Sequence, residues 1–359
     1  MLNTIKKANT QTFNIPNRID SLQAARLFSA LFVSLFHFTI IWEKLDPTII
    51  NVGFWVRFFF AVSGFIIMLS TQNPAKKKWF FTRRLIRLVP LYWILTLCTF
   101  AAAQFVPDIL GYRPTVDQLV KSMFFIPYSR SALKSDSVLR PLVGLGHTLQ
   151  IEVLFSLIFM LCMRFSHKFR GLIASAVLVV LLLLGLTFDF ANPFMQFYIN
   201  SNTTSWGAFI VGILCYYLLS LLAKKQTPVK KTPCLIIPAL ITILLLSVSQ
   251  LFYFQLPSAI AFSIQYIAFF FILVFIIMYS FWKLPTLPFF IKLGSASFSY
   301  YLIHYFLVSI SEKVFKINAF SAVNIILIVL TLIAAWICSY ISWYFIENLL
   351  GKYLTSKLK

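Results

Sequence analysis

Apolar runs of roughly 20 residues recur along this chain, and they constrain its fold more than any other feature. A run of that length crosses the hydrocarbon core of a bilayer, about 30 Å thick, as a single helix. Hydrophobic residues make up 60% of the chain and charged residues 11%, which is more apolar surface than one water-soluble core can hide. The sequence therefore predicts an all-α, polytopic membrane protein and excludes a large water-soluble enzyme.

We predict about ten transmembrane helices. Their approximate bounds are residues 22–42, 52–71, 85–104, 146–163, 171–188, 204–222, 234–253, 259–281, 291–311 and 322–346. The first is followed by no small-residue cleavage site, so we expect a retained span rather than a signal peptide. The chain shows neither repeats nor low-complexity linkers, which favours a single membrane-embedded domain over residues 1–359. Within it we expect a cytoplasmic N-terminal segment (1–20) and one long outward-facing loop (105–145).

The placement of the charges explains the formal net charge of +21. Basic residues gather in alternate connections, at Lys6 to Arg18, Lys76 to Arg87, Arg164 to Arg170, Lys224 to Lys231, Lys283 to Lys292 and Lys352 to Lys359. The other connections hold most of the acids, namely Glu43, Asp46, Asp108, Asp117, Asp136, Asp189 and Glu312. By the positive-inside rule, both termini are cytoplasmic. The basic excess is then a topology signal and an attraction to anionic lipid, so the expected partner is the lipid bilayer and not nucleic acid.

The cysteines carry no sign of a metal centre or a disulfide framework. They stand in or beside apolar runs, without CxxC pairs or metal-ligand spacing, at Cys98, Cys162, Cys215, Cys234 and Cys338. We therefore expect core cysteines, no metal site and no bound cofactor.

Three proton-transfer groups fall at one depth in the outer half of the predicted bundle. His37 lies about 20 Å above the cytoplasmic end of the first span. Glu152 enters the fourth span from outside and reaches a similar level, and His304 in the ninth span reaches about 18 Å. Ionisable groups inside a membrane are functional candidates, and a carboxylate there must be paired, hydrogen-bonded or protonated. These three residues are candidate catalytic residues, although His37 also fits a satisfied polar residue between helices.

Basic side chains form a second layer at the cytoplasmic ends of the spans. Arg26 opens the first span, Arg84 and Arg87 open the third, and Glu347 closes the tenth. Guanidinium groups bind phosphates bidentately, so the three arginines suit a phosphorylated cytoplasmic ligand. Arg83 and Arg84 also fit ordinary positive-inside anchors, whereas Arg87 lies one helical turn beyond Arg84 on the same face.

Other polar residues receive structural interpretations. Ser63 and Gly64 in the second span are expected to permit close helix packing. His147 lies nearer the outer surface and fits a rim residue. His167 stands in a basic turn, where we expect it to be solvated.

Taken in order, six segments resemble the acyltransferase 3 family of integral membrane acyltransferases, particularly its exopolysaccharide O-acetyltransferase branch. IDSLQAARLFSALFVSLFHF is similar to the family's first helix, in which ten residues separate an Arg from a His, here Arg26 and His37. FFFAVSGFIIM resembles its FFxxSGF segment. FFTRRLIRLVPLYWILTL resembles its third helix, with Arg84 and Arg87 at the RxxR positions.

The resemblance continues to the end of the chain. Tyr92 and Trp93 follow the RxxR positions as supporting residues. PLVGLGHTLQIEVLFSLIF resembles the segment ending in GWTLxxExxF, which places Glu152 at the family Glu. LGSASFSYYLIHYFLV is similar to the SYSLYLxH stretch, with His304 at the His, and SWYFIENLL resembles the closing helix, with Glu347 at the Glu. No single motif is decisive, but six in the right order are strong together.

The chain departs from the family pattern at three positions. His147 stands where the family usually has Trp, Leu349 where Pro often follows the final Glu, and Tyr301 where Leu is usual. None of these changes removes a proposed proton-transfer residue. His147 leaves the acceptor specificity open.

The resemblance implies an O-acyltransferase of the bacterial cytoplasmic membrane. Its donor would be an acyl-CoA, first of all acetyl-CoA, as a co-substrate. Its acceptor would be a hydroxyl group of a cell-surface or exopolysaccharide glycan, or of a lipid-linked saccharide precursor. Arg26, Arg84 and Arg87 would hold the donor phosphates while the pantetheine arm reaches toward His37.

His37 suits a general base, because an unperturbed imidazole titrates at about 6.5. Glu152 would orient it and stabilise the imidazolium, and His304 would shuttle a second proton or hydrogen-bond the acceptor. In a two-step route, which the sequence leaves open, His37 would instead be acylated first. Buried His, Glu and Arg on ten helices also describe a proton-coupled transporter or glycan flippase, although carriers more often show inverted repeats.

Overall fold

The computed structural model is mainly helical, in agreement with the predicted fold class. It describes residues 10–16, 19–41, 52–107, 110–129, 139–251, 255–315 and 322–358. The chain divides into two compact units, which we describe separately. Unit 1 comprises Met1–Ser70 and Ala208–Tyr340, and unit 2 comprises Thr71–Gly207 and Ile341–Lys359. That the whole chain forms one domain stays a prediction.

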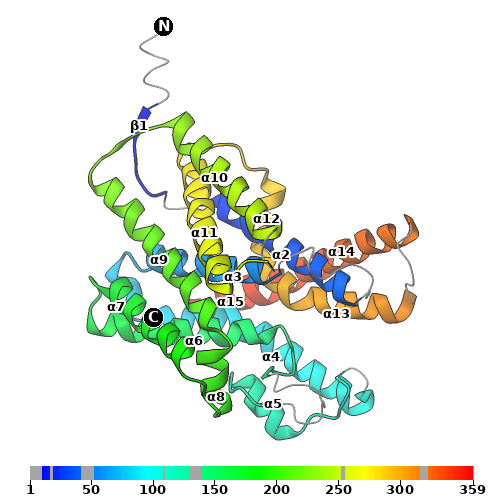
Figure 1. Cartoon of the computed structure of the whole chain (residues 1–359). Coiled ribbons are helices and arrows are strands. Elements are labelled where there is room, and N and C mark those ends of the chain that lie inside the picture. The colour runs from blue at the N-terminus through cyan, green and yellow to red at the C-terminus, as the bar shows by residue number, and fades with distance from the viewer. Residues whose placement is uncertain are drawn as a thin grey trace. The chain divides into compact units, whose positions relative to one another are not determined.

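Helix α2 organises unit 1. The helices of this unit are α2 (Asp20–Ile41), α3 (Val52–Ser70), α9 (Thr203–Lys224, from Ala208 on), α10 (Lys231–Leu251), α11 (Ser258–Phe281), α12 (Pro288–Ser295), α13 (Ser297–Phe315) and α14 (Ala322–Ser342, to Tyr340). Helix α2 contacts α3, α11, α12 and α13, while α10 and α11 pack against each other as neighbours (Figure 1). This arrangement brings the histidines of α2 and α13 to adjacent helices.

Helices α3 and α9 approach so closely that glycine is required on both. A Cβ atom at Gly64 would overlap the backbone carbonyl of Phe209, and one at Gly212 would overlap the carbonyl of Ala61. Small residues allow helix backbones to pack in this way inside a membrane. Ser63, next to Gly64, is also buried.

Two short strands of the described chain form a small antiparallel sheet in unit 1. Strand β1 (Thr10–Thr12) pairs antiparallel with β2 (Pro228–Lys230), which connects α9 to α10. Beyond β1, the ring of Phe13 packs 5.1 Å from that of Phe281 at the end of α11. The N-terminal segment is thereby fixed to unit 1.

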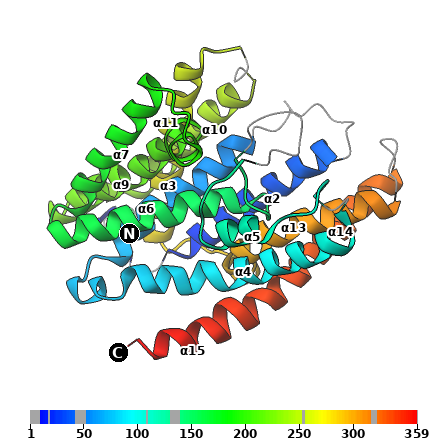
Figure 2. The same cartoon turned by 90° about the horizontal axis from the view of Figure 1, so that it is seen from below.

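Helix α4 organises unit 2. The elements of this unit are η1 (Pro74–Lys77), α4 (Phe80–Phe105), α5 (Val116–Met123), α6 (Gly146–Phe165), α7 (Arg170–Thr187), α8 (Pro193–Met195), the π-helices η3 (Gln196–Asn200) and η4 (Trp343–Leu350), and α15 (Gly351–Ser356). Helix α4 packs against α5, α6, η4 and α15, and α15 runs alongside it in Figure 2. Helix α6 packs in turn against α7.

Nine helical segments of the described chain are long and apolar enough to cross a membrane. They coincide with nine of the ten predicted spans. The exception is the predicted span 291–311, which the structure divides into α12 and α13 at Ala296. The protein is an integral membrane protein, whereas the number of crossings and the orientation of the termini stay predictions.

Candidate functional site

Two of the predicted catalytic residues, His37 of α2 and His304 of α13, lie side by side in unit 1. Their ring centroids are 5.3 Å apart. The ring of Tyr305 stands edge-on to His37 at 5.1 Å. His37 is half-buried, and His304 is 0% exposed. This direct contact is consistent with the equal depth that the sequence predicts for the two histidines.

The surroundings of His304 fix its tautomer. Its Nδ1 atom lies 2.9 Å from the carbonyl oxygen of Tyr300. A carbonyl oxygen only accepts hydrogen bonds, so Nδ1 carries the proton and Nε2 keeps its lone pair. Within the described residues this buried Nε2 has no hydrogen-bond partner. His304 thus offers an unprotonated ring nitrogen at a buried position.

Stacked aromatic rings hold the histidine pair in place. The ring of Tyr300 stacks on Trp336 at 3.9 Å and on His304 at 5.3 Å, with interplanar angles of 12° and 14°. The hydroxyl of Tyr300 donates a hydrogen bond of 2.8 Å to Ser34, one turn before His37 on α2. These contacts fix α13 relative to α2, which limits the freedom of both imidazoles.

A second pair lies in unit 2, where Arg84 of α4 forms an ion pair of 2.5 Å with Glu152 of α6. The two side chains are 16% and 26% exposed. We expected these residues in separate layers, and the difference comes from the start of the helix. Helix α4 begins at Phe80, whose ring packs 5.7 Å from that of Phe159, six residues before the end of α6, so Arg84 lies close to the level of Glu152.

The other two arginines of the predicted donor layer, Arg26 and Arg87, differ in their exposure. Arg87 is exposed on α4, as is Arg83. Arg26 is half-buried in unit 1 and donates to Gln23 at 3.4 Å. Glu347 lies in η4, which packs against α4. The structure thus describes the His37–His304 and Arg84–Glu152 pairs within separate units, and their convergence on one site stays a prediction.

The supporting residues Tyr92 and Trp93 anchor helix α5. The Tyr92 hydroxyl donates to the carbonyl of Ser122 and the Trp93 indole donates to that of Met123, both at 2.9 Å. The Tyr92 ring also stacks on Phe125 at 5.1 Å. Part of the predicted outward-facing loop is thereby attached to α4.

The two remaining histidines, His147 and His167, each contact a backbone carbonyl oxygen. The Nδ1 atom of His147 lies 2.9 Å from the carbonyl of Gly144 at the start of α6, a local contact typical of a helix end. The Nε2 atom of His167 lies 2.8 Å from the carbonyl of Thr71, and the buried Arg170 donates to the Thr71 hydroxyl at 3.0 Å. The interpretation of His167 as merely solvated is therefore wrong, because it joins a packed hydrogen-bonded turn.

Sequence reasoning missed three polar residues inside helices. Arg57 lies in α3, and its Nε and Nη2 atoms donate to Oε1 of Gln265 at 3.1 and 2.7 Å. Arg57 was detectable, because it is an ionisable residue inside a predicted span. Gln150 of α6 is 0% exposed, and within the described residues neither its Oε1 nor its Nε2 has a hydrogen-bond partner. The sequence carried no comparable signal for the two glutamines.

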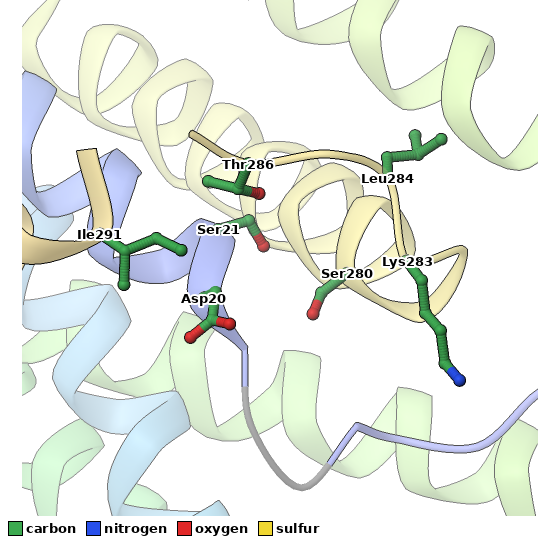
Figure 3. A pocket seen from close by; sticks show the side chains of 7 residues that line it. All are labelled: Asp20, Ser21, Ser280, Lys283, Leu284, Thr286 and Ile291. Atoms are coloured by element: carbon green, nitrogen blue, oxygen red, sulfur yellow. The ribbon is translucent and has the colours of Figure 1, made fainter. Parts of the chain in front are cut away.

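A polar pocket of about 280 Å³ lies at the start of α2 in unit 1. It is lined by Asp20, Ser21, Ser280, Lys283, Leu284, Thr286 and Ile291. In Figure 3 the Asp20 carboxylate faces the space beside α11, while the side chain of Lys283 extends away from it. Arg26 stands six residues further along α2, or about 9 Å of helix. The pocket thus lies at the end of α2 that carries a predicted donor-binding residue.

Comparisons with known proteins agree with these features. A protein-family model described as an acyltransferase domain matches residues 19–344. The exopolysaccharide production protein ExoZ of Rhizobium meliloti (strain 1021) is 29% identical over 146 residues, which cover 40% of this chain and 44% of that protein. The chain thus matches less than half of the length of this relative. No solved structure matches the chain.

Proposed function

The chain belongs to the acyltransferase 3 family, and from this premise we propose that it is a membrane-bound O-acetyltransferase. Its donor is acetyl-CoA, and its acceptor is a hydroxyl group of a cell-surface or exopolysaccharide glycan or of the lipid-linked precursor. The name of the relative, an exopolysaccharide production protein, supports the acceptor class. The membrane is the bacterial cytoplasmic membrane, where acetyl-CoA is available on one face.

The observation that carries the proposal is the contact between His37 and His304. His37 acts as general base and takes the proton of the acceptor hydroxyl while the oxygen attacks the thioester carbonyl carbon. The carbon–sulfur bond of the tetrahedral intermediate then breaks, and the thiolate leaves with the proton returned by the His37 imidazolium. The products are the O-acetylated glycan and free CoA.

His304 assists this proton transfer in the proposed mechanism. Its Nε2 lone pair, buried beside the His37 ring, accepts a proton or a hydrogen bond from that ring or from the acceptor. Acylation of His37 itself, followed by transfer, is the alternative two-step route with the same products.

In this proposal Arg84 and Arg87 of unit 2 bind the phosphates of the donor. The ion pair with Glu152 orients Arg84, while the exposed Arg87 is accessible to a phosphate group. The pocket near Asp20 suits a neutral, hydrogen-bonding part of the donor, because a carboxylate would repel its phosphates.

The test compares glycans from cells that carry the wild type, His37→Ala or His304→Ala. Mass spectrometry and NMR of the isolated glycan identify the acyl group and its position. We expect loss of O-acetylation in His37→Ala at unchanged membrane levels of the protein, and a strong reduction in His304→Ala. His167→Gln is the control, because the Gln amide nitrogen reaches as far as Nε2 of His167 and can still donate to the Thr71 carbonyl. Identical glycans in wild type and His37→Ala would overturn the proposal and favour a transporter.

A further inference from the structure

Tyr305 of α13 is an aromatic residue beside the proposed general base, and the mechanism above gives it no role. Its ring stands perpendicular to that of His37, with an interplanar angle of 84° and a centroid distance of 5.1 Å. Tyr305 is 39% exposed, whereas the preceding residue, His304, is fully buried. Tyr305 therefore combines a contact with His37 and an accessible surface.

This exposure is unusual, because Tyr305 stands on the packed face of α13. Residues three and four positions apart share one face of a helix. On the N-terminal side of Tyr305, Tyr301 and Leu302 are both buried at these distances. On its C-terminal side, Val308 is buried and Ser309 is half-buried. Tyr305 is thus accessible on the side of α13 that carries the histidine pair.

The side of α13 that suits contact with lipid lies elsewhere. Two exposed apolar residues of this helix are Ile310 and Val314. At 3.6 residues per turn, they lie about 140° and 180° around the helix from Tyr305. Tyrosines also anchor membrane proteins at the lipid interface, but an anchor of that kind would share the face of Ile310 and Val314. The position of Tyr305 therefore favours contact with a ligand over contact with lipid.

The other rings around the histidine pair are less exposed than Tyr305. Tyr300 and Trp336, which stack beside the pair, are buried, and so is Tyr301. The ring of Phe36, 5.8 Å from that of the α2 histidine, belongs to a half-buried residue. Among these described rings, Tyr305 has the largest exposed fraction. A substrate that approaches the general base meets this ring.

We propose that Tyr305 binds the acceptor and that the group it contacts is a sugar ring. A pyranose has a C–H face, which packs against an aromatic ring, and hydroxyl groups, which hydrogen-bond with a phenol. Ligand sites combine aromatic surface with a few polar groups in the same way. The identity of the acceptor as a glycan rests on the proposed function. A sugar bound on Tyr305 presents a hydroxyl group to His37.

The test measures the binding of sugar and not acyl transfer. The full-length protein is purified in lauryldimethylamine oxide, a detergent without a sugar headgroup. The probe is a set of oligosaccharides from the exopolysaccharide of the cells that make the protein, treated with mild alkali to remove O-acyl groups. Isothermal titration calorimetry gives their Kd. We expect saturable binding to the wild type that polyethylene glycol, which has no sugar ring, does not reproduce.

Two substitutions at Tyr305 separate the ring from the hydroxyl group. Tyr305→Leu removes both and should raise the Kd about tenfold or more. Tyr305→Phe keeps the ring and should raise the Kd by about two- to tenfold. Both variants should fold, because the side chain is exposed. Tyr353→Leu on α15 is the matched control, since it removes an exposed tyrosine of unit 2 without a proposed role and should leave the Kd unchanged.

A kinetic measurement then distinguishes the acceptor from the donor. Tyr305→Leu should raise the KM for the oligosaccharides and leave the KM for acetyl-CoA unchanged. A rise in the KM for acetyl-CoA alone would assign Tyr305 to the donor and overturn its role in acceptor binding.

Two binding results would also overturn this role. One is a wild type that binds the oligosaccharides no better than polyethylene glycol, and the other is a Tyr305→Leu variant that binds them as tightly as the wild type. Because binding requires no acyl transfer, either result would leave the acetylation result for His37→Ala unaffected. Conversely, unchanged glycans in His37→Ala would overturn the enzymatic proposal, while sugar binding at Tyr305 could still be measured.

Discussion

We predict that the Arg84–Glu152 ion pair stabilises the protein more than an exposed ion pair does. The perturbation is a double-mutant cycle that combines Arg84→Gln and Glu152→Gln. Each single substitution leaves the other charge between α4 and α6, while the double variant leaves two neutral amides of similar size. The pair of Lys121 and Asp117 on α5, at 2.7 Å, offers a matched control cycle in the same unit.

The magnitude follows from how much of each side chain is exposed. Breaking a buried pair by removal of one partner costs about 3 to 5 kcal/mol, whereas exposed pairs contribute about 0.2 to 1 kcal/mol. Arg84 and Glu152 are 16% and 26% exposed, so screening by water reduces the buried value. We expect Glu152→Gln to cost about 2 to 3 kcal/mol, with a coupling energy of about 1.5 kcal/mol or more across the cycle. The control pair is 38% and 66% exposed, and its coupling should be about 0.3 to 0.5 kcal/mol.

The assay is reversible unfolding of the purified protein in mixed micelles with increasing SDS, followed by tryptophan fluorescence. The four proteins of each cycle are measured under one set of conditions. The coupling energy is the change in unfolding free energy of the double variant minus the sum of the changes in the two single variants. A coupling below about 0.5 kcal/mol for Arg84 and Glu152, equal to that of the control, would refute the reasoning. It would mean that the two charges are solvated independently.

Two further predictions concern packing and the donor. Gly64→Ala places a Cβ against the Phe209 carbonyl and should destabilise the protein by about 1 to 3 kcal/mol in the same assay, whereas Gly144→Ala meets no atom within 4 Å and should be neutral. Equal stability of the two variants would contradict the close approach of α3 and α9. Arg87→Ala should raise the KM for acetyl-CoA with little change in kcat, and Arg83→Ala, exposed on the same helix, should not; equal effects on KM would speak against a donor site at Arg87.

The spans were predictable because their signal is local. A run of apolar residues long enough to cross a bilayer defines each helix without reference to the rest of the chain, and nine described segments bear this out. The predicted span 291–311 was wrong in its continuity, because the turn at Ala296 between α12 and α13 depends on packing against α2. Buried hydroxyl groups at Ser297 and Ser299 there reduce the apolar signal as well.

A contact in the candidate site could be predicted only where the depth of each residue along its helix is enough to identify its neighbour. Counting the rise per residue placed His37 and His304 at one level, and the structure brings their rings together. The same counting separated Arg84 from Glu152, because it assumed that α4 starts level with the end of α6, whereas Phe80 packs beside Phe159. The contact between Arg57 and Gln265 spans 208 positions of the chain and depends on which faces of α3 and α11 meet, which no local pattern reveals.

The pairing of β1 with β2 has a consequence for how freely the N-terminal segment can vary. Strand pairs are held by main-chain hydrogen bonds, which every residue except proline can donate and accept. The identities of Thr10, Gln11 and Thr12 can therefore change with little effect on the pairing to Pro228–Lys230. The number of residues within β1 is constrained instead, because one residue inserted or deleted there shifts the register of its pairing with β2. Among related chains this segment should vary in sequence more readily than in length.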